Sequence, residues 1–522
     1  MGGIELARPL YFWLGFLATA TGVVLHLPMY LHGADMHYRL AGMEMDTPMT
    51  IGMALIVVGL AATGYGLIPR GAFASRPAGE VRVRALDDAR MRPAHLGLIV
   101  VLSIAVIIDA MKPITLGFVV PGMAKEYGLR SALNPHGEWP AAILPLAGLT
   151  GTVLGSLLWG WMGDRIGRKP SILFAGVLFI GTAICGAMPD IRWNLVMCLL
   201  MGLGAGGMLP ITFSLLAETI PPRHKGWVMV LIGGNLAVAY VAASWLSAAL
   251  APTYSWRIMW LIGLPTGVFL ILLNRFIPES PRFLLAHGRD EEAHRIMARY
   301  GAATTQAVEL VEDEQPGGYS RLFRPPFTGL TVAVVILGLS IGLVTYGFQL
   351  WIPSNLQKLG LDQPTADRAL RDSALLGLPL IFISAAMYGL WSAKKTIVVL
   401  ATLVGAALVV LSFAGESLAQ DRTWLYILLA GPIVGTATIA AVLAAYSSEI
   451  YPTRVRSRGS GLSAGVGKFG GVAVTAFLVA GAAAPSIGAT ALLGAVPLVL
   501  AVAAVLLFGV ETRKTELQPV EV

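Results

Sequence analysis

The chain has 522 residues, of which 56% are hydrophobic and only 13% are charged. A soluble globular domain carries about 25% charged residues, so about half of the charge that a water-facing surface needs is missing. The low charge content excludes a water-soluble enzyme and a nucleic-acid-binding domain. A disulfide-stabilised secreted module is also excluded, because the two cysteines, Cys185 and Cys198, both lie inside apolar runs. The sequence therefore predicts an integral protein of the lipid bilayer that binds no nucleic acid.

Apolar runs long enough to cross a bilayer recur along the whole chain. A membrane-spanning helix needs about 20 mainly apolar residues. The runs predict an all-α membrane protein with fourteen spans, near residues 9–31, 47–69, 95–121, 139–162, 170–188, 193–218, 225–249, 255–277, 326–353, 370–392, 395–414, 422–448, 456–482 and 486–509.

Lysine and arginine collect in alternate loops, among them 70–94, 163–169 and 449–458, whereas the opposite loops are balanced or slightly acidic. Positively charged loops remain in the cytoplasm. The first apolar run lacks a small-residue cleavage site after it, so it reads as a retained span. We expect a multi-pass protein of the cell membrane with both termini in the cytoplasm.

Two polar segments that follow apolar runs have the same pattern, E-x-x-P-x-R-x-(K/R). They start at Glu218 and at Glu449, and six predicted spans separate them. Two six-helix halves joined by a linker are the plan of many secondary transporters. The expected parts are a two-helix extension (1–69), an arginine-rich cytoplasmic linker (70–94), an N-terminal bundle (95–277), an inter-bundle linker (278–325), a C-terminal bundle (326–509) and a cytoplasmic tail (510–522).

Three motifs carry a family resemblance. The run from Gly160 to Lys169 resembles the G-x-x-x-D-R-x-G-R-K loop of the major facilitator superfamily, and Pro278 to Leu285 resembles the P-E-S-P-R-W-L-L signature of its sugar-porter and organic-ion branches. The segment from Glu449 to Gly459 resembles E-x-Y-P-T-x-x-R-x-x-G of the same branches. The resemblance implies the superfamily fold, here with two extra N-terminal spans. It also implies gating roles for Gly160, Asp164, Arg165, Gly167, Arg168, Lys169, Glu218, Arg223, Glu279, Arg282, Glu449, Arg454 and Arg456.

Three ionisable residues fall within predicted spans: Asp109, Lys112 and Lys468. A charge at mid-bilayer costs about 2.5–3.5 kcal/mol on insertion scales, so such residues usually have a function. Pro113 predicts a broken helix beside Lys112. Related aromatic-acid/proton symporters resemble D-G-x-D at this place, where this chain has Asp109-Ala-Met-Lys112. We expect Asp109 to carry a proton and both lysines to attract an anion, the alternatives being a self-neutralising pair and a lysine bonded to backbone carbonyls.

The remaining polar and aromatic candidates suit an aromatic or amphipathic ligand, although each alone is also typical of packing. They are Tyr346, Gln349, Trp351, Tyr240, Asn235 and Tyr446.

The sequence thus predicts a secondary active transporter, not an enzyme, which carries a small carboxylate-like anion by proton symport and alternating access. Its partners would be the substrate, protons and lipid, with no cofactor, because the G-x-G-x-x-G run from Gly202 to Gly207 lies inside an apolar span and no Walker motif occurs. Two alternatives stay open. One is a multidrug or amphiphile exporter on the same fold. The other is a copper-handling protein that uses His26, His32, His37 and the methionines of 26–53.

Overall fold

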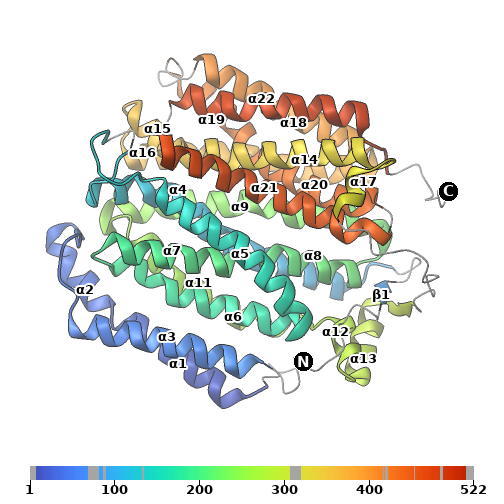
Figure 1. Cartoon of the computed structure of the whole chain (residues 1–522), viewed down its shortest axis with the longest axis horizontal. Coiled ribbons are helices and arrows are strands. Elements are labelled where there is room, and N and C mark those ends of the chain that lie inside the picture. The colour runs from blue at the N-terminus through green and yellow to red at the C-terminus, as the bar shows by residue number, and fades with distance from the viewer. Residues whose placement is uncertain are drawn as a thin grey trace. The chain divides into compact units, whose positions relative to one another are not determined.

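The protein is described by a computed structural model (Figure 1). Within the residues that the structure describes, fourteen helices are long and apolar enough to cross a membrane, as predicted. The chain divides into two compact units, and helix α9 (Pro222–Tyr254) contributes to both. The first unit comprises Met1–Pro222 and Ala243–Val308, and the second comprises Arg223–Ala242 and Glu309–Val522. The residues that the structure describes are 7–68, 82–85, 90–131, 134–305, 319–414, 417, 421–451, 453–481 and 486–512.

The first unit is built from long helices with short connecting turns. Its elements are α1 (Pro9–Val24), α2 (Leu27–His32), the 3₁₀ turn η1 (Gly33–Met36), α3 (Thr47–Leu67), β1 (Arg82–Ala85), α4 (Pro93–Glu126), α5 (Ile143–Arg165), α6 (Arg168–Gly181), η3 (Thr182–Ala187), α7 (Ile191–Ala205), α8 (Met208–Thr219), most of the second half of α9, α10 (Ile258–Leu261), α11 (Gly263–Leu273), η4 (Asn274–Phe276), α12 (Pro281–Ala286), α13 (Asp290–Tyr300) and β2 (Ala302–Thr305).

The second unit contains two π-helical segments, η6 and η9, within its spans. Its elements are the start of α9, η5 (Tyr319–Phe323), α14 (Thr328–Gly342), η6 (Leu343–Phe348), the 3₁₀ turn η7 (Gln349–Trp351), α15 (Ile352–Lys358), α16 (Gln363–Gly377), α17 (Pro379–Leu390), α18 (Ala393–Ala414), α19 (Arg422–Ala430), η9 (Gly431–Gly435), α20 (Thr436–Ile450), α21 (Thr453–Gly481) and α22 (Ile487–Phe508).

The two extra N-terminal spans, α1 and α3, pack against each other as a helical hairpin beside α6 (Figure 1). Glycines let the two backbones approach closely: a Cβ atom on Gly15 would lie 2.5 Å from the backbone nitrogen of Thr63, and one on Gly59 would lie 2.4 Å from Oγ1 of Thr19. Small residues serve the same purpose in many membrane helix pairs. The extension is therefore an integral part of the first unit.

A buried carboxylate, Glu126 at the end of α4, anchors the loop between η1 and α3. One of its oxygens accepts hydrogen bonds from the backbone N–H groups of Leu40 (2.7 Å) and Ala41 (3.1 Å). The same oxygen lies 2.7 Å from Nη2 of Arg257, whose side chain is fully buried. One carboxylate thus joins the N-terminal extension to two core helices of the first unit.

The described parts of the predicted linkers that belong to the first unit, β1, α12, α13 and β2, form a small subdomain at the end of this unit opposite α2 (Figure 1). Strands β1 and β2 pair antiparallel, Arg82 with Thr305, and add a two-stranded ribbon to the otherwise helical fold. His95 at the start of α4 is buried, accepts a hydrogen bond at Nδ1 from the N–H of Arg92 (2.9 Å), and its Nε2 lies 3.1 Å from the carbonyl oxygens of both Thr219 and Tyr300. These bonds fix the subdomain to α4 and α8.

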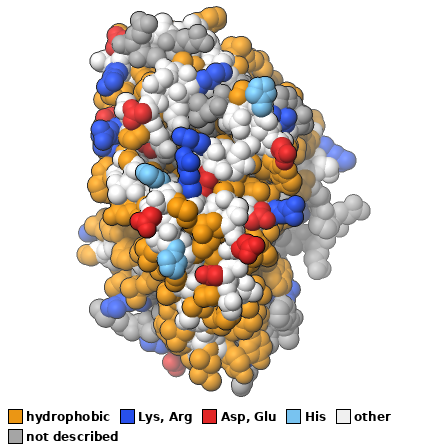
Figure 2. Space-filling view, turned by 90° about the vertical axis from the view of Figure 1, so that its left-hand side faces the viewer, with side chains coloured by type: hydrophobic (Ala, Val, Ile, Leu, Met, Phe, Trp, Pro, Cys, Tyr) orange, Lys and Arg blue, Asp and Glu red, His pale blue; other side chains and the backbone are white. Residues whose placement is uncertain are grey.

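Large hydrophobic side chains remain exposed along the spans, among them Leu157, Phe413 and Leu507. Figure 2 shows one end of the molecule, where acidic, basic and histidine side chains are interspersed with polar ones and hydrophobic side chains border them. Apolar flanks with a polar end are the arrangement that a bilayer requires of a spanning protein.

Candidate functional site

Asp109 and Lys112 lie on α4, buried inside the first unit, where they are 5% and 9% exposed. The ammonium of Lys112 donates a hydrogen bond to Oγ1 of Thr266 on α11 (3.1 Å) and lies 5.5 Å from the ring centre of Phe179 on α6. It also interacts electrostatically with Asp109, as the three-residue spacing predicts. The two charges therefore act on each other inside the first unit.

The expected break in the helix at Pro113 is not found, because α4 runs without interruption from Pro93 to Glu126. Proline cannot donate the helical hydrogen bond to the carbonyl four residues earlier. Membrane helices tolerate that loss when neighbouring groups satisfy the backbone, and the hydroxyl of Thr115 donates to the carbonyl of Met111 (2.7 Å) one turn away. The inference of a discontinuous helix was wrong.

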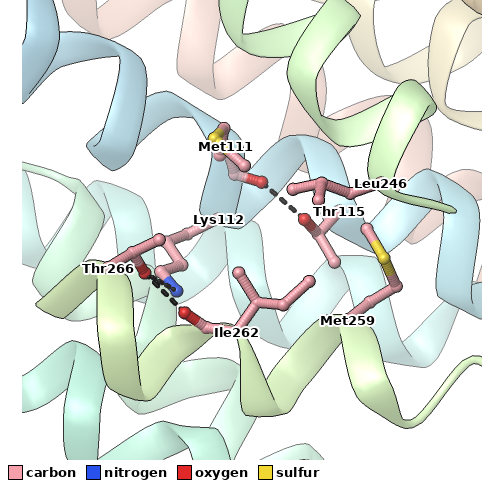
Figure 3. A pocket seen from close by; sticks show the side chains of 7 residues that line it. All are labelled: Met111, Lys112, Thr115, Leu246, Met259, Ile262 and Thr266. Atoms are coloured by element: carbon pink, nitrogen blue, oxygen red, sulfur yellow. Dashed lines mark hydrogen bonds between the residues drawn. The ribbon is translucent and has the colours of Figure 1, made fainter. Parts of the chain in front are cut away.

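A small cavity adjoins Lys112 (Figure 3), with a volume of about 10 Å³. That volume suits one water molecule and not an organic anion. The hydroxyl of Thr266 donates to the carbonyl of Ile262 (2.8 Å), so both threonines beside the cavity direct lone pairs, not hydrogens, toward further ligands. Contact of Lys112 with a carboxylate would need these side chains to rearrange. The cavity is lined by Met111, Lys112, Thr115, Leu246, Met259, Ile262 and Thr266.

The three predicted motifs of the first unit meet in one buried polar network. Nη2 of Arg168 lies 3.0 Å from Oε1 of Glu218, and the other oxygen of Glu218 accepts a hydrogen bond from Ser280 (2.6 Å). Glu279 accepts from the backbone N–H groups of Arg168 (2.9 Å) and Lys169 (3.2 Å) at the start of α6. A carboxylate at a helix N-terminus is favoured by the helix dipole. Residues distant in sequence thus clamp the end of α6.

Burial raises the pKa of Glu279 above its ordinary value of 4.5, although hydrogen bonds from the backbone N–H groups of Ser280, Arg168 and Lys169 oppose this shift. Gly167, directly before α6, has a φ of +103°, and a Cβ atom there would lie 2.6 Å from Glu279. The glycine of the motif is therefore required by both backbone conformation and space.

The second unit repeats the arrangement with different residues. Glu449 accepts hydrogen bonds from the hydroxyls of Tyr388 (2.7 Å) and Thr512 (2.9 Å), as Glu218 does from Ser280. Glu511 accepts from the N–H of Ala393 (3.2 Å) and from the hydroxyl of Ser392, at the start of α18. Our sequence analysis missed Glu511 and Thr512. The sequence feature that could have revealed them is the pair Glu511-Thr512, which follows the last predicted span as Glu279-Ser280 follows the eighth predicted span.

For the other predicted gating residues, the structure shows at most how exposed each side chain is. Arg223 is exposed, whereas Arg165, Lys169 and Arg282 are partly buried. Four others belong to α5 or α21, but their side chains lie outside the described residues: Gly160, Asp164, Arg454 and Arg456.

The predicted ligand-binding residues of the second unit fall into two places. Tyr346 lies in the π-helical segment η6, and Nε2 of Gln349 donates to the carbonyl of Pro432 in η9 (2.5 Å). Trp351 is 2% exposed. By contrast, the hydroxyl of Tyr446 is bonded to the backbone of Val510, so this tyrosine lies beside the Glu511 network and not with Tyr346.

Two residues of α9 and one of α21 complete the predicted set. Tyr240 is buried and interacts electrostatically with Asp367, while Asn235 is half-buried. Lys468 is partly buried on a glycine-rich helix whose Gly467 carbonyl would lie 2.1 Å from a Cβ on Gly342. Asp367 is 1% exposed. We missed it because our predicted span began at residue 370, whereas α16 begins at Gln363.

The histidines considered for copper do not converge. His26 is fully buried and bonds through Nδ1 to the carbonyl of Gly22 (2.7 Å), whereas His32 and His37 are exposed. Among the residues that the structure describes, no group of three histidine, cysteine or acidic side chains is placed to hold a metal ion.

The sequence of this chain is similar to those of known membrane transporters. The niacin transporter NiaP of Acinetobacter baylyi is 28% identical over 402 residues, covering 75% of this chain and 88% of the relative. The benzoate transport protein of the same bacterium is 25% identical over 403 residues, covering 74% and 83%. The 4-hydroxybenzoate transporter PcaK of Pseudomonas aeruginosa is 28% identical over 413 residues, covering 75% and 87%.

A solved structure with the same fold is the partially occluded, inward-open xylose transporter XylE of E. coli. It has a TM-score of 0.62 at 16% identity and covers 82% of this chain and 100% of its own. Residues 101–473 match the family model of the Major Facilitator Superfamily, which is more than half of the chain. The protein is therefore a multi-pass integral membrane protein, and it belongs to the Major Facilitator Superfamily.

Proposed function

We propose that this protein is a secondary active transporter of a small aromatic or heteroaromatic carboxylate, driven by protons through alternating access. The observation that carries the proposal is the buried pair of Asp109 and Lys112 on a continuous spanning helix. Relatives named for niacin, benzoate and 4-hydroxybenzoate transport support the choice of an organic anion over an amphiphile exporter.

The chemistry follows from the charges. A buried ionised carboxylate is unfavourable unless it is paired with a positive charge. Protonation of Asp109 would therefore weaken its electrostatic attraction for the ammonium of Lys112. Lys112, once less tightly engaged by Asp109, can attract a substrate carboxylate. Within the second unit, Lys468 is a further candidate for attracting an anion, and Tyr346, Trp351 and Tyr240 are candidates for contact with an aromatic ring.

The networks around Glu218 and Glu449 would control the exchange of conformations. Buried charge-assisted hydrogen bonds are specific and break as units, which suits a latch. The protein would work in the cell membrane with both termini in the cytoplasm, as the arginine-rich loops favour.

The test is uptake of labelled nicotinate, benzoate and 4-hydroxybenzoate by proteoliposomes with and without an imposed pH gradient. The proposal expects a gradient to stimulate uptake of at least one of them. Asp109→Asn should abolish the stimulation, whereas Asp35→Asn, which alters an exposed carboxylate, should preserve it.

Lysine variants distinguish a loss of attraction for the substrate anion from a general loss of folded protein. Lys112→Met should weaken carboxylate uptake, whereas Lys358→Met, at an exposed position on α15, should not. No uptake of any carboxylate, combined with efflux of lipophilic cations, would support the exporter alternative instead.

A further inference from the structure

Several buried amide and indole nitrogens of the second unit have no hydrogen-bond partner. Trp351 and Asn355 are each 2% exposed. Leaving a buried donor unsatisfied costs about 1–3 kcal/mol, so several in one region point to a ligand that supplies acceptors. Within the described part of the chain, the unit's unpartnered buried nitrogens are Nδ2 of Asn235, Nε1 of Trp351, Nδ2 of Asn355, Nε2 of Gln357 and Nε2 of Gln363.

Three of these donors belong to adjacent helical segments, one of which also carries a buried carboxylate. Trp351 and Asn355 are four residues apart along η7 and α15, and Gln363 and Asp367 are four residues apart on α16. Residues at this spacing share one side of a helix. Helices α15 and α16 pack against each other, and Asp367 also interacts with Tyr240 of α9. Two turns of adjacent helices thus bring neutral donors and Asp367 into one region.

The backbone of the same region is irregular. The π-helical segment η6 leads directly into η7, and the π-helical segment η9 packs against α16. Gln349 joins the two irregular regions through its hydrogen bond to Pro432. Single π-helical turns occur frequently at functional sites. This observation is independent of the unpartnered donors and points to the same place.

We propose that Trp351, Asn355 and Gln363 bind the carboxylate of the substrate, and that Asp367 makes this binding depend on one proton. The inference rests on the proposed transport of a carboxylate. Two carboxylates cannot both stay ionised at close range in a site that excludes water. The substrate anion therefore binds when Asp367 has taken a proton from solution, and releasing the proton expels the anion.

No other charged group on α16, or on the described helices packed against it, is placed to couple substrate binding to a proton as Asp367 is. On α16 itself, Arg368 is exposed and Arg371 pairs with Asp372. On the helices packed against α16, Lys358 of α15 and Arg422 of α19 are exposed. The remaining titratable groups on α17 and α19 are the phenols of Tyr388 and Tyr426. On α9, Tyr240 interacts with Asp367, whereas the other titratable groups lie at the two ends of the helix: Arg223, His224 and Lys225 in its first turn and Tyr254 at its last residue.

The experiment measures binding of benzoate and of its neutral isostere benzamide to the purified full chain, from mildly acidic to mildly alkaline pH. In the wild type the Kd for benzoate should rise by up to about tenfold per pH unit, as linkage to one proton requires, while the Kd for benzamide stays level. Asp367→Asn should bind benzoate as tightly at alkaline pH as the wild type does at acidic pH.

A carboxylate control on the same helix makes the result specific. Asp372→Asn should keep the pH dependence of benzoate binding. A retained slope in Asp367→Asn, or a slope lost in Asp372→Asn, overturns the inference and leaves the proposed function standing. Loss of benzoate binding in an Asp367→Asn protein that still binds benzamide overturns it as well.

The donors are tested separately. Asn355→Leu and Gln363→Leu should each raise the Kd for benzoate about tenfold at acidic pH without changing its slope. Unchanged affinity in both variants overturns the assignment of the donors. If the wild type binds and transports no carboxylate at any pH, the proposed function itself fails.

Discussion

The guanidinium of Arg168 lies 3.0 Å from the carboxylate of Glu218, and both side chains are almost completely buried. The two residues come from different motifs, one at the start of α6 and the other at the end of α8. Their ion pair therefore connects the loop motif of residues 160–169 directly to the first E-x-x-P-x-R segment, which begins at Glu218.

Arg168→Ala should strongly destabilise the protein, because it leaves Glu218 buried without its cation. Breaking a buried pair costs about 3–5 kcal/mol of unfolding free energy. Unfolding in mixed detergent micelles measures the change. Arg289→Ala is the control, because Arg289 pairs with Glu292 at a site about one third exposed and an exposed pair is worth about 0–1 kcal/mol. Equal losses in the two variants would contradict this account.

Glu279→Gln should alter how stability depends on pH. Burial raises the pKa of Glu279 in the folded protein, so the folded state holds its proton at higher pH than the unfolded state does. Its contribution to stability is then complete below the unfolded pKa and is lost as pH rises through the folded pKa. The unfolding temperature of the wild type, relative to the variant, should therefore fall from acidic toward neutral pH. A relative rise over that range would show that the hydrogen bonds outweigh burial.

Gly167→Ala should destabilise the start of α6. The residue has a φ of +103°, and its Cβ would lie 2.6 Å from Glu279. Such strain costs about 1–3 kcal/mol. Gly163→Ala, within α5, meets nothing within 4 Å, and replacing a helical glycine by alanine should add up to about 1 kcal/mol. The two unfolding temperatures should move in opposite directions.

Glu126→Gln should loosen the N-terminal extension as well as lower stability. The variant leaves the fully buried Arg257 without its carboxylate, at a cost of about 3–5 kcal/mol. Because Leu40 and Ala41 also bond to Glu126, proteolysis within residues 33–46 should become faster. Glu138→Gln, at an exposed position, should change neither measurement.

Several parts of the site were beyond reach of the sequence. Asp367 was assigned to a loop because the hydropathy of residues 363–369 is low, yet packing extends the helix and buries the carboxylate. Tyr446 was grouped with the ligand-binding aromatics, but its hydroxyl bonds to Val510. Pro113 suggested a break, but α4 is continuous. The outcomes for Asp367 and Tyr446 depend on contacts between segments far apart in the chain.

The sequence by itself determined that this is a membrane protein of the Major Facilitator Superfamily, and it determined where the spans of the described residues lie. Those features follow from local apolar content and from motifs whose residues are contiguous. Only the tertiary structure decided that Glu279 and Glu511 clamp the starts of α6 and α18, that Lys112 contacts Thr266, and that Asp367 is buried. Helix rotation and packing set these relationships, because they determine which side of each apolar helix faces a neighbour and which faces lipid.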